Sequence, residues 1–95
     1  LIQFVPIHKR SWHAGKSSFQ GRTNCNDFSI GIELEGCDYE EFTSKQYDAL
    51  SELILFLSES LKINKNNIVG HSDIAPERKT DPGPYFDWNL LKSML

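Results

Sequence analysis

The sequence contains no long apolar run and only two cysteines. No stretch approaches the roughly eighteen apolar residues that a membrane-spanning helix needs, and no basic and apolar leader ends in a small-residue cleavage site. Cys25 and Cys37 are too few for a disulfide framework and too far apart for a paired-cysteine metal motif. We therefore expect two reduced thiols in a cytoplasmic protein, since disulfides are rare in that compartment.

Positive charge is also scarce. The chain carries 10 Lys and Arg residues against 13 Asp and Glu residues, a formal net charge of −3. Such a chain has no general attraction to nucleic acid or to an anionic membrane, so neither is an expected partner. A hydrophobic content of 39% favours a globular fold, and a length of 95 residues limits it to a single domain. We expect a monomer that binds its ligand at one local site.

Three short segments have the pattern of β-strands: residues 1–5 (LIQFV), 29–35 (SIGIELE) and 66–70 (NNIVG). The second segment alternates most clearly. Its two sets of alternate positions are Ile30, Ile32 and Leu34, and Gly31, Glu33 and Glu35. Because the first segment alternates from the first residue, with no start methionine or turn before it, we expect part of the protein to lie upstream.

Two segments have the pattern of helices. Thr43 and Gln46 form a capping-box pair, and an apolar stripe at spacings of three and four follows. The stripe consists of Tyr47, Leu50, Ile54, Leu57 and Leu61. We predict a helix over residues 44–61 and a second one over residues 88–95, capped by Asp87. Residues 7–27 show no sustained period and predict a long loop.

The segment GHSDIAPERKTDPGP, residues 70–84, combines charged side chains with prolines that stiffen it. His71 and Asp81 supply nitrogen and oxygen donors of the kind that bind zinc. Lys79 lies two residues before Asp81, so in an extended segment it leaves on the same side and suits stabilisation of an oxyanion. The alternative is a solvated connector with a surface lysine.

Two further places offer candidates for chemistry. Glu33 is a candidate general base if its face of the predicted strand lines a cleft, and Glu35 on the same face competes for that role. Trp12 and His13 either line a substrate cleft or are a structural aromatic and a hydrogen-bonded imidazole. Arg78 either pairs with a substrate carboxylate or is a solvated surface charge.

These segments together resemble a known family. The motifs WHAG at residues 12–15, GRTNCNDFSIGIELEG at 21–36 and GHSDIAPERKTDPGPYFDW at 70–88 occur in order over nearly the whole chain. They are similar to motifs of the zinc-dependent N-acetylmuramoyl-L-alanine amidases of the AmpD type, in the superfamily of the peptidoglycan recognition proteins.

The resemblance implies an α/β (α+β) fold, a mixed β-sheet flanked by helices, of which this chain would lack the N-terminal strand and helix. Residues 1–95 would then form one amidase domain that is incomplete at its N-terminus. The expected reaction is hydrolysis of the amide between the muramic acid and the L-alanine of anhydromuropeptides, in the cytoplasm, during peptidoglycan recycling.

By the same resemblance, His71 and Asp81 match two zinc ligands, and the third ligand is a histidine expected upstream of this chain. Glu33 and Lys79 match the catalytic residues. The residues expected to contact substrate are Trp12, His13, Asn26 and Arg78. Two other functions stay open: a peptidoglycan-binding module without catalysis, and a phage-type lytic amidase that acts on intact cell wall.

Overall fold

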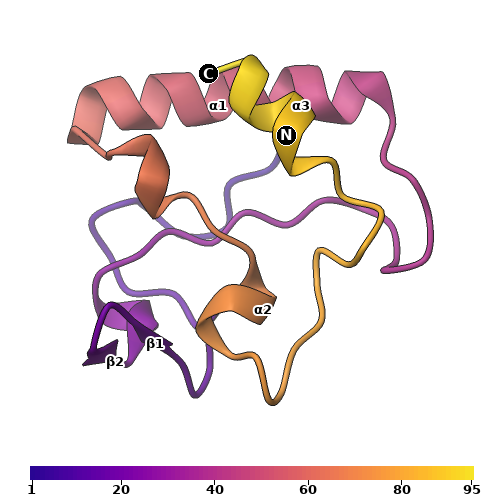
Figure 1. Cartoon of the computed structure of the whole chain (residues 1–95). Helices are drawn as coiled ribbons and strands as arrows, with labels where there is room; N and C mark the ends of the chain where they lie inside the picture. The colour runs from indigo at the N-terminus through magenta and orange to yellow at the C-terminus, as the bar shows by residue number, and fades with distance from the viewer.

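The computed structural model describes all residues from 1 to 95 (Figure 1). Its elements follow in chain order: β1 (Ser18–Phe19), β2 (Arg22–Thr23), the 3₁₀ turn η1 (Cys25–Asp27), α1 (Ser44–Leu61), the 3₁₀ turn η2 (Lys65–Asn67), α2 (His71–Ile74) and α3 (Trp88–Ser93). The helix α1 is the longest element, and the loops that carry the candidate residues lie to one side of it (Figure 1). No helix combines the length and the apolar character needed to cross a membrane.

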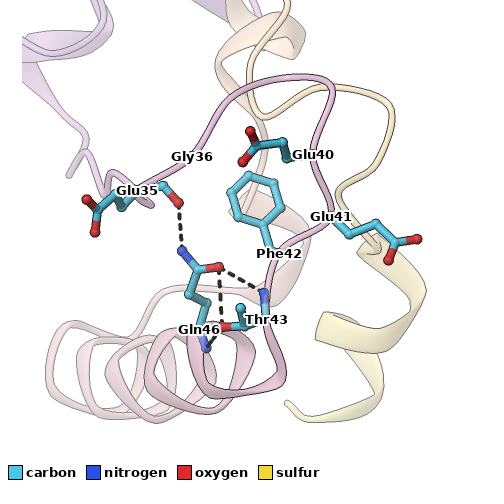
Figure 2. Close-up of a pocket in the computed structure, with 7 residues that line it drawn as sticks. All are labelled: Glu35, Gly36, Glu40, Glu41, Phe42, Thr43 and Gln46. Carbon is cyan, nitrogen blue, oxygen red and sulfur yellow. Dashed lines mark hydrogen bonds between the residues drawn. The ribbon is translucent and has the colours of Figure 1, made fainter.

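Helix α1 begins and ends as the sequence predicts. The Thr43 hydroxyl oxygen accepts a hydrogen bond from the Gln46 backbone N–H at 3.2 Å. The Gln46 side-chain oxygen in turn accepts one from the Thr43 N–H at 2.9 Å, as Figure 2 shows. These reciprocal bonds satisfy two N–H groups that have no partner inside the helix. The helix ends at Leu61, because the next residue, Lys62, has a left-handed backbone (φ 55°).

The core forms where α1 and α3 meet. Phe86 lies at its centre, with ring centroids 5.4 Å from Tyr47 and 4.7 Å from Trp88. Leu91 of α3 is 1% exposed and belongs to the same cluster. The predicted apolar stripe of α1 is buried except for its last member, Leu61, which is 46% exposed. Burial of this stripe and of α3 supplies the main apolar contribution to stability.

The predicted long loop over residues 7–27 is wrong in part. The strands β1 and β2 form an antiparallel hairpin within it, pairing Ser18 with Thr23 and Phe19 with Arg22. Both residues of its turn, Gln20 and Gly21, have positive φ angles, 50° and 82°. Such two-residue turns match the twist of paired strands and favour glycine. The Gly21 position was therefore the signal that could have revealed the hairpin.

The prediction of three strands is wrong, because none of the three segments pairs with a neighbouring strand. Residues 1–5 and 29–35 form no strand, and residues 66–70 contain the end of η2 and the extended approach to α2. No backbone hydrogen bond joins residues 29–36 to any other segment. Alternation predicts which side chains share a side, but a strand also needs a neighbour with which to pair. The two-stranded sheet of β1 and β2 is the one sheet present.

Adjacent leucines of α3 give a matched test of this core. Leu91 is 1% exposed, whereas Leu90 is 40% exposed. We expect Leu91→Ala to lower the free energy of unfolding by about 2–5 kcal/mol, because it removes buried methyl groups and leaves a cavity. Leu90→Ala is expected to cost less than about 1 kcal/mol. Chemical denaturation of both variants measures this, and equal losses would contradict the assigned core.

Candidate functional site

The charged loop of residues 70–84 is closed by its own backbone and held from outside. The Gly70 N–H donates to the Asp73 carboxylate at 2.8 Å, which caps the short helix α2. The Ser72 N–H donates to the Asp81 carbonyl at 3.0 Å and brings the two ends of the loop together. A turn of this kind places the first residue of α2 opposite Asp81.

Asp38, in the loop before α1, holds the far side of the charged loop. The Thr80 hydroxyl donates to the Asp38 carboxylate. Gly83 has a φ of 86°, and a Cβ added there would lie 2.5 Å from the Asp38 carbonyl oxygen. Only glycine fits this close approach. Asp81 therefore lies between two fixed points, the Ser72 bond on one side and the Asp38 contacts on the other.

His71 and Asp81 face each other within this loop. The His71 Nδ1 lies 3.2 Å from the Asp81 Oδ2, and the His71 Nε2 lies 3.0 Å from the Ala14 carbonyl oxygen. A carbonyl oxygen only accepts, so the Nε2 of His71 carries the hydrogen. In the neutral ring the Nδ1 lone pair then points at a carboxylate oxygen.

Two acceptors that face each other need a proton or a cation between them. One imidazole nitrogen and one carboxylate oxygen are donors that zinc accepts. The donor chemistry of His71 and Asp81 therefore fits a divalent metal. No group of three or more His, Cys, Asp or Glu side chains converges in the structure.

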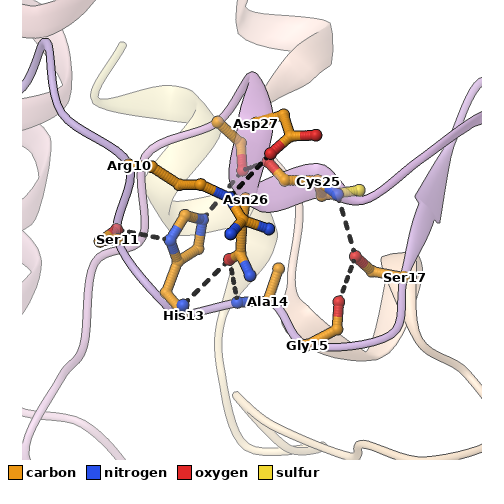
Figure 3. A network of polar contacts seen from close by, with 10 residues as sticks. Arg10, Ser11, His13, Ala14, Gly15, Ser17, Cys25, Asn26 and Asp27 are labelled. Carbon is orange, nitrogen blue, oxygen red and sulfur yellow. Dashed lines mark hydrogen bonds and ion pairs between the residues drawn. The ribbon is translucent and has the colours of Figure 1, made fainter.

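Ala14 links the charged loop to the N-terminal part of the chain; Figure 3 shows the bond of its N–H with the Asn26 side chain. The Ala14 carbonyl also accepts from the Arg78 guanidinium at 2.6 Å, and the same guanidinium group donates to the Lys16 carbonyl at 3.0 Å. On the other side, the Asn26 side-chain oxygen accepts from the N–H groups of His13 and Ala14 at 3.0 and 2.8 Å. Asn26 is 6% exposed, so its side chain is an internal support of this loop.

His13 is held between two serines. Its Nδ1 lies 2.7 Å from the Ser11 hydroxyl and its Nε2 lies 2.9 Å from the Ser29 hydroxyl. A Cβ added at Gly31 would lie 2.6 Å from the ring, so the ring packs on the Gly31 backbone. Burial lowers the pKa of His13 from 6.5, a hydrogen bond with Ser11 raises it, and the nearby charge of His71 lowers it further. His13 therefore tends to stay neutral.

Trp12 is the exposed member of the same segment. Its side chain is 83% exposed, and the Arg10 guanidinium lies 4.0 Å from the ring centroid. The Arg10 Nε pairs with the Asp27 carboxylate at 2.7 Å. This arrangement holds one face of the indole against a fixed cation and leaves the rest of the ring open to a ligand.

Glu33 and Lys79 lie in the segments that meet here, but no hydrogen bond or ion pair joins either side chain to His71 or Asp81. Neither side chain forms an ion pair, since the two pairs in the structure involve other residues. Glu33 is exposed and lies two residues after the Gly31 position on which the His13 ring packs. Lys79 is half-buried, and its backbone N–H donates to Ala75 at 2.9 Å.

Glu35 has a different environment. Its carbonyl oxygen accepts from the Gln46 side chain at 2.7 Å. Glu35 is one of the residues that line a cavity of about 430 Å³ beside the start of α1, together with Glu40 and Glu41 (Figure 2). Glu33 does not line this cavity. The two glutamates that the alternation left equivalent are therefore distinct in the structure.

Sequence reasoning missed the residues that hold the site. The Ala14 carbonyl carries no signal in the sequence, because every residue has one. The internal role of Asn26 and the Asp38 contact also depend on tertiary structure. Gly15, with a φ of 63°, was the available signal for a turn at this point.

Comparison with known proteins identifies relatives over the whole chain. The family model for N-acetylmuramoyl-L-alanine amidase matches residues 1–84. The 1,6-anhydro-N-acetylmuramyl-L-alanine amidases AmpD of Enterobacter cloacae and Escherichia coli are 56% and 54% identical over 95 residues, which are 51% and 52% of their lengths. The chain therefore spans about half the length of these relatives, and 100% of it is matched.

Two solved structures give the same answer for the fold. A crystal structure of AmpD matches with a TM-score of 0.95 at 53% identity and covers 99% of this chain and 52% of that one. A complex of AmiD from Escherichia coli with anhydro-N-acetylmuramic acid-L-Ala-D-gamma-Glu-L-Lys matches with a TM-score of 0.93 at 40% identity, covering 98% and 40%. The predicted α/β class is confirmed by these matches.

The lowered pKa of His13 predicts a pH-dependent contribution to stability. Between that lowered pKa and 6.5 the unfolded chain binds more protons at this residue than the folded chain. The free energy of unfolding therefore falls as the pH falls from about 6.5 to the lowered pKa of His13. At higher pH, His13 does not make the free energy of unfolding depend on pH. We expect His13→Gln to reduce the loss of stability between about pH 7.5 and about pH 5. Denaturation of both proteins at each pH measures this, and an equal loss would contradict it.

Proposed function

Because the chain belongs to the N-acetylmuramoyl-L-alanine amidase family, we propose that it acts in hydrolysis of the amide between anhydro-N-acetylmuramic acid and L-alanine in muropeptides of peptidoglycan recycling. The observation that carries the proposal is a pair of facing atoms that can both bind a metal ion. They are His71 Nδ1 and Asp81 Oδ2, which lie 3.2 Å apart. The match of the whole chain to AmpD relatives at 56% and 54% identity supports the substrate class. Residues 1–95 form part of a single amidase domain in this proposal.

His71 and Asp81 are the proposed zinc ligands. Their nitrogen and oxygen donors suit the metal, and both are held by contacts outside the pair, with Ala14 and with Ser72. Zinc, when bound, supplies Lewis-acid activation of a water molecule and of the substrate carbonyl. The family resemblance adds a third histidine ligand upstream of residue 1.

Glu33 is the proposed general base and Lys79 the proposed cation. Glu33 would take a proton from the attacking water and pass it to the leaving amine of L-alanine. Lys79 would stabilise the negative charge that develops on the carbonyl oxygen. Packing of the His13 ring on Gly31 supports Glu33 over Glu35, because it brings the segment that contains Glu33 to the same loop that contacts His71.

The proposed muropeptide contacts come from the WHAG segment and its supports. Trp12 offers an exposed aromatic face, of the kind that lines ligand sites. The direct substrate contacts predicted for His13, Asn26 and Arg78 stay predictions. The hydrogen bonds of these three side chains support a second contribution, which is to fix the shape of the loop that presents Trp12.

We also propose the cytoplasm as the place of action and a monomer as the active form. The family resemblance supports the first, and both cysteines are unpaired, with Cys25 buried and Cys37 exposed. Muropeptide is the one proposed partner.

Paired glutamate variants test the chemistry. Incubation of the protein with an anhydromuramoyl tripeptide is expected to release free stem peptide, detected by mass spectrometry, and a zinc chelator is expected to stop the release. Glu33→Gln is expected to lower turnover by about 10²- to 10⁴-fold, because it removes a general base without changing the shape of the side chain. Glu35→Gln is the matched control and should keep the parent rate.

Three outcomes would count against the proposal. Release that continues in the chelator would remove the metal from the reaction. Equal losses in the two glutamate variants would remove Glu33 from its role. Binding of the muropeptide without any hydrolysis would favour a peptidoglycan-binding module instead.

A further inference from the structure

Arg78 and His71 share one acceptor, the Ala14 carbonyl oxygen. The Arg78 guanidinium donates to it at 2.6 Å and the His71 Nε2 at 3.0 Å. Ala14 is 1% exposed, so its carbonyl has little access to water and depends on these two donors. The second bond of the guanidinium group, to the Lys16 carbonyl at 3.0 Å, spans the turn at Gly15. Arg78 thereby fixes the direction in which the Ala14 carbonyl points.

Gly15 permits this arrangement. Its φ is 63°, and a Cβ added there would lie 2.6 Å from a terminal nitrogen of Arg78. The guanidinium therefore packs directly on the turn it bridges. The peptide N–H of Ala14 is fixed separately, by Asn26 at 2.8 Å. Ala14 is thus held through its N–H and its carbonyl, which belong to successive peptide groups, and the carbonyl is the group bonded to both Arg78 and His71.

The tautomer of His71 depends on this acceptor. With the hydrogen on Nε2, the ring donates to Ala14 and presents the Nδ1 lone pair to Asp81. With the hydrogen on Nδ1, the ring would donate directly to the Asp81 carboxylate at 3.2 Å, a favourable charge-assisted bond. The second tautomer has no lone pair left for a metal at this position. A firmly placed Ala14 carbonyl favours the first tautomer.

We propose that Arg78 is a positioning residue of the candidate metal site: it holds the Ala14 carbonyl as the acceptor for the His71 Nε2–H, and so directs the Nδ1 lone pair of His71 toward Asp81. The role in metal binding rests on the proposed function, whereas the effect on the tautomer does not. Partners that orient a metal-binding histidine typically change metal affinity by about 10- to 100-fold.

Nitrogen NMR of the His71 ring in the metal-free protein tests this directly, measured where the ring is neutral. The parent is expected to show the Nε2–H tautomer, and Arg78→Ala is expected to increase the Nδ1–H fraction. Both bonds of Arg78 come from one terminal nitrogen of its planar guanidinium. Arg78→Lys keeps the charge, but its ammonium is a compact group on a more flexible stem, so an intermediate ratio is expected. Arg22→Ala is the matched control, because Arg22 stacks on Phe28 and not on the Ala14 turn.

Zinc affinity, measured by competition with a coloured chelator, is the second readout. Arg78→Ala is expected to bind zinc about 10-fold more weakly than the parent or the Arg22→Ala control. An unchanged tautomer ratio in both Arg78 variants would overturn the proposal, even if hydrolysis were lost. A changed ratio would support it even if the protein proved to be a binding module, so the two proposals fail separately.

Discussion

The hydrogen bonds of the Ala14 peptide are the constraint on which the candidate site depends. Its carbonyl receives His71 and Arg78 from the charged loop, and its N–H reaches Asn26. The N–H and the carbonyl of Ala14 belong to two successive peptide groups, and neither group can rotate without losing its hydrogen bonds. The position of His71 is therefore set by a segment 57 residues away in sequence as well as by the loop in which it lies.

The aromatic core fixes the other side of the charged loop. Phe86 and Trp88 follow the loop directly and pack against α1. The Tyr47 hydroxyl of α1 accepts from the Asp87 N–H at 2.8 Å, which ties the start of α3 to the long helix. A Cβ added at Gly70 would lie 2.8 Å from Pro82 and 3.3 Å from Trp88, so the two ends of the loop pack on each other above the core. The residues that stabilise the core therefore also fix the geometry of the loop that carries the candidate site.

The sequence predicts those parts of the structure that depend on local rules. Helix α1 follows from its capping box and apolar spacing, and His71 and Asp81 were expected together from their donor chemistry and the stiff loop between them. The strands at 1–5 and 29–35 were not formed, because alternation says nothing about whether a neighbour is present to pair. The hairpin at Gln20 and Gly21 was missed because its strands are only two residues each. Contacts through backbone carbonyls, such as that of Ala14, leave no mark on side-chain patterns.

The central claim is that His71 and Asp81 present one nitrogen and one oxygen to the same cation. Anomalous diffraction at the zinc edge, on crystals of the protein grown with zinc, tests it most directly. We expect a metal peak between the His71 Nδ1 and the Asp81 carboxylate, with the His71 Nε2 still bonded to the Ala14 carbonyl. Zinc bound through Nε2, or at other residues while this pair stays unchanged, would contradict it.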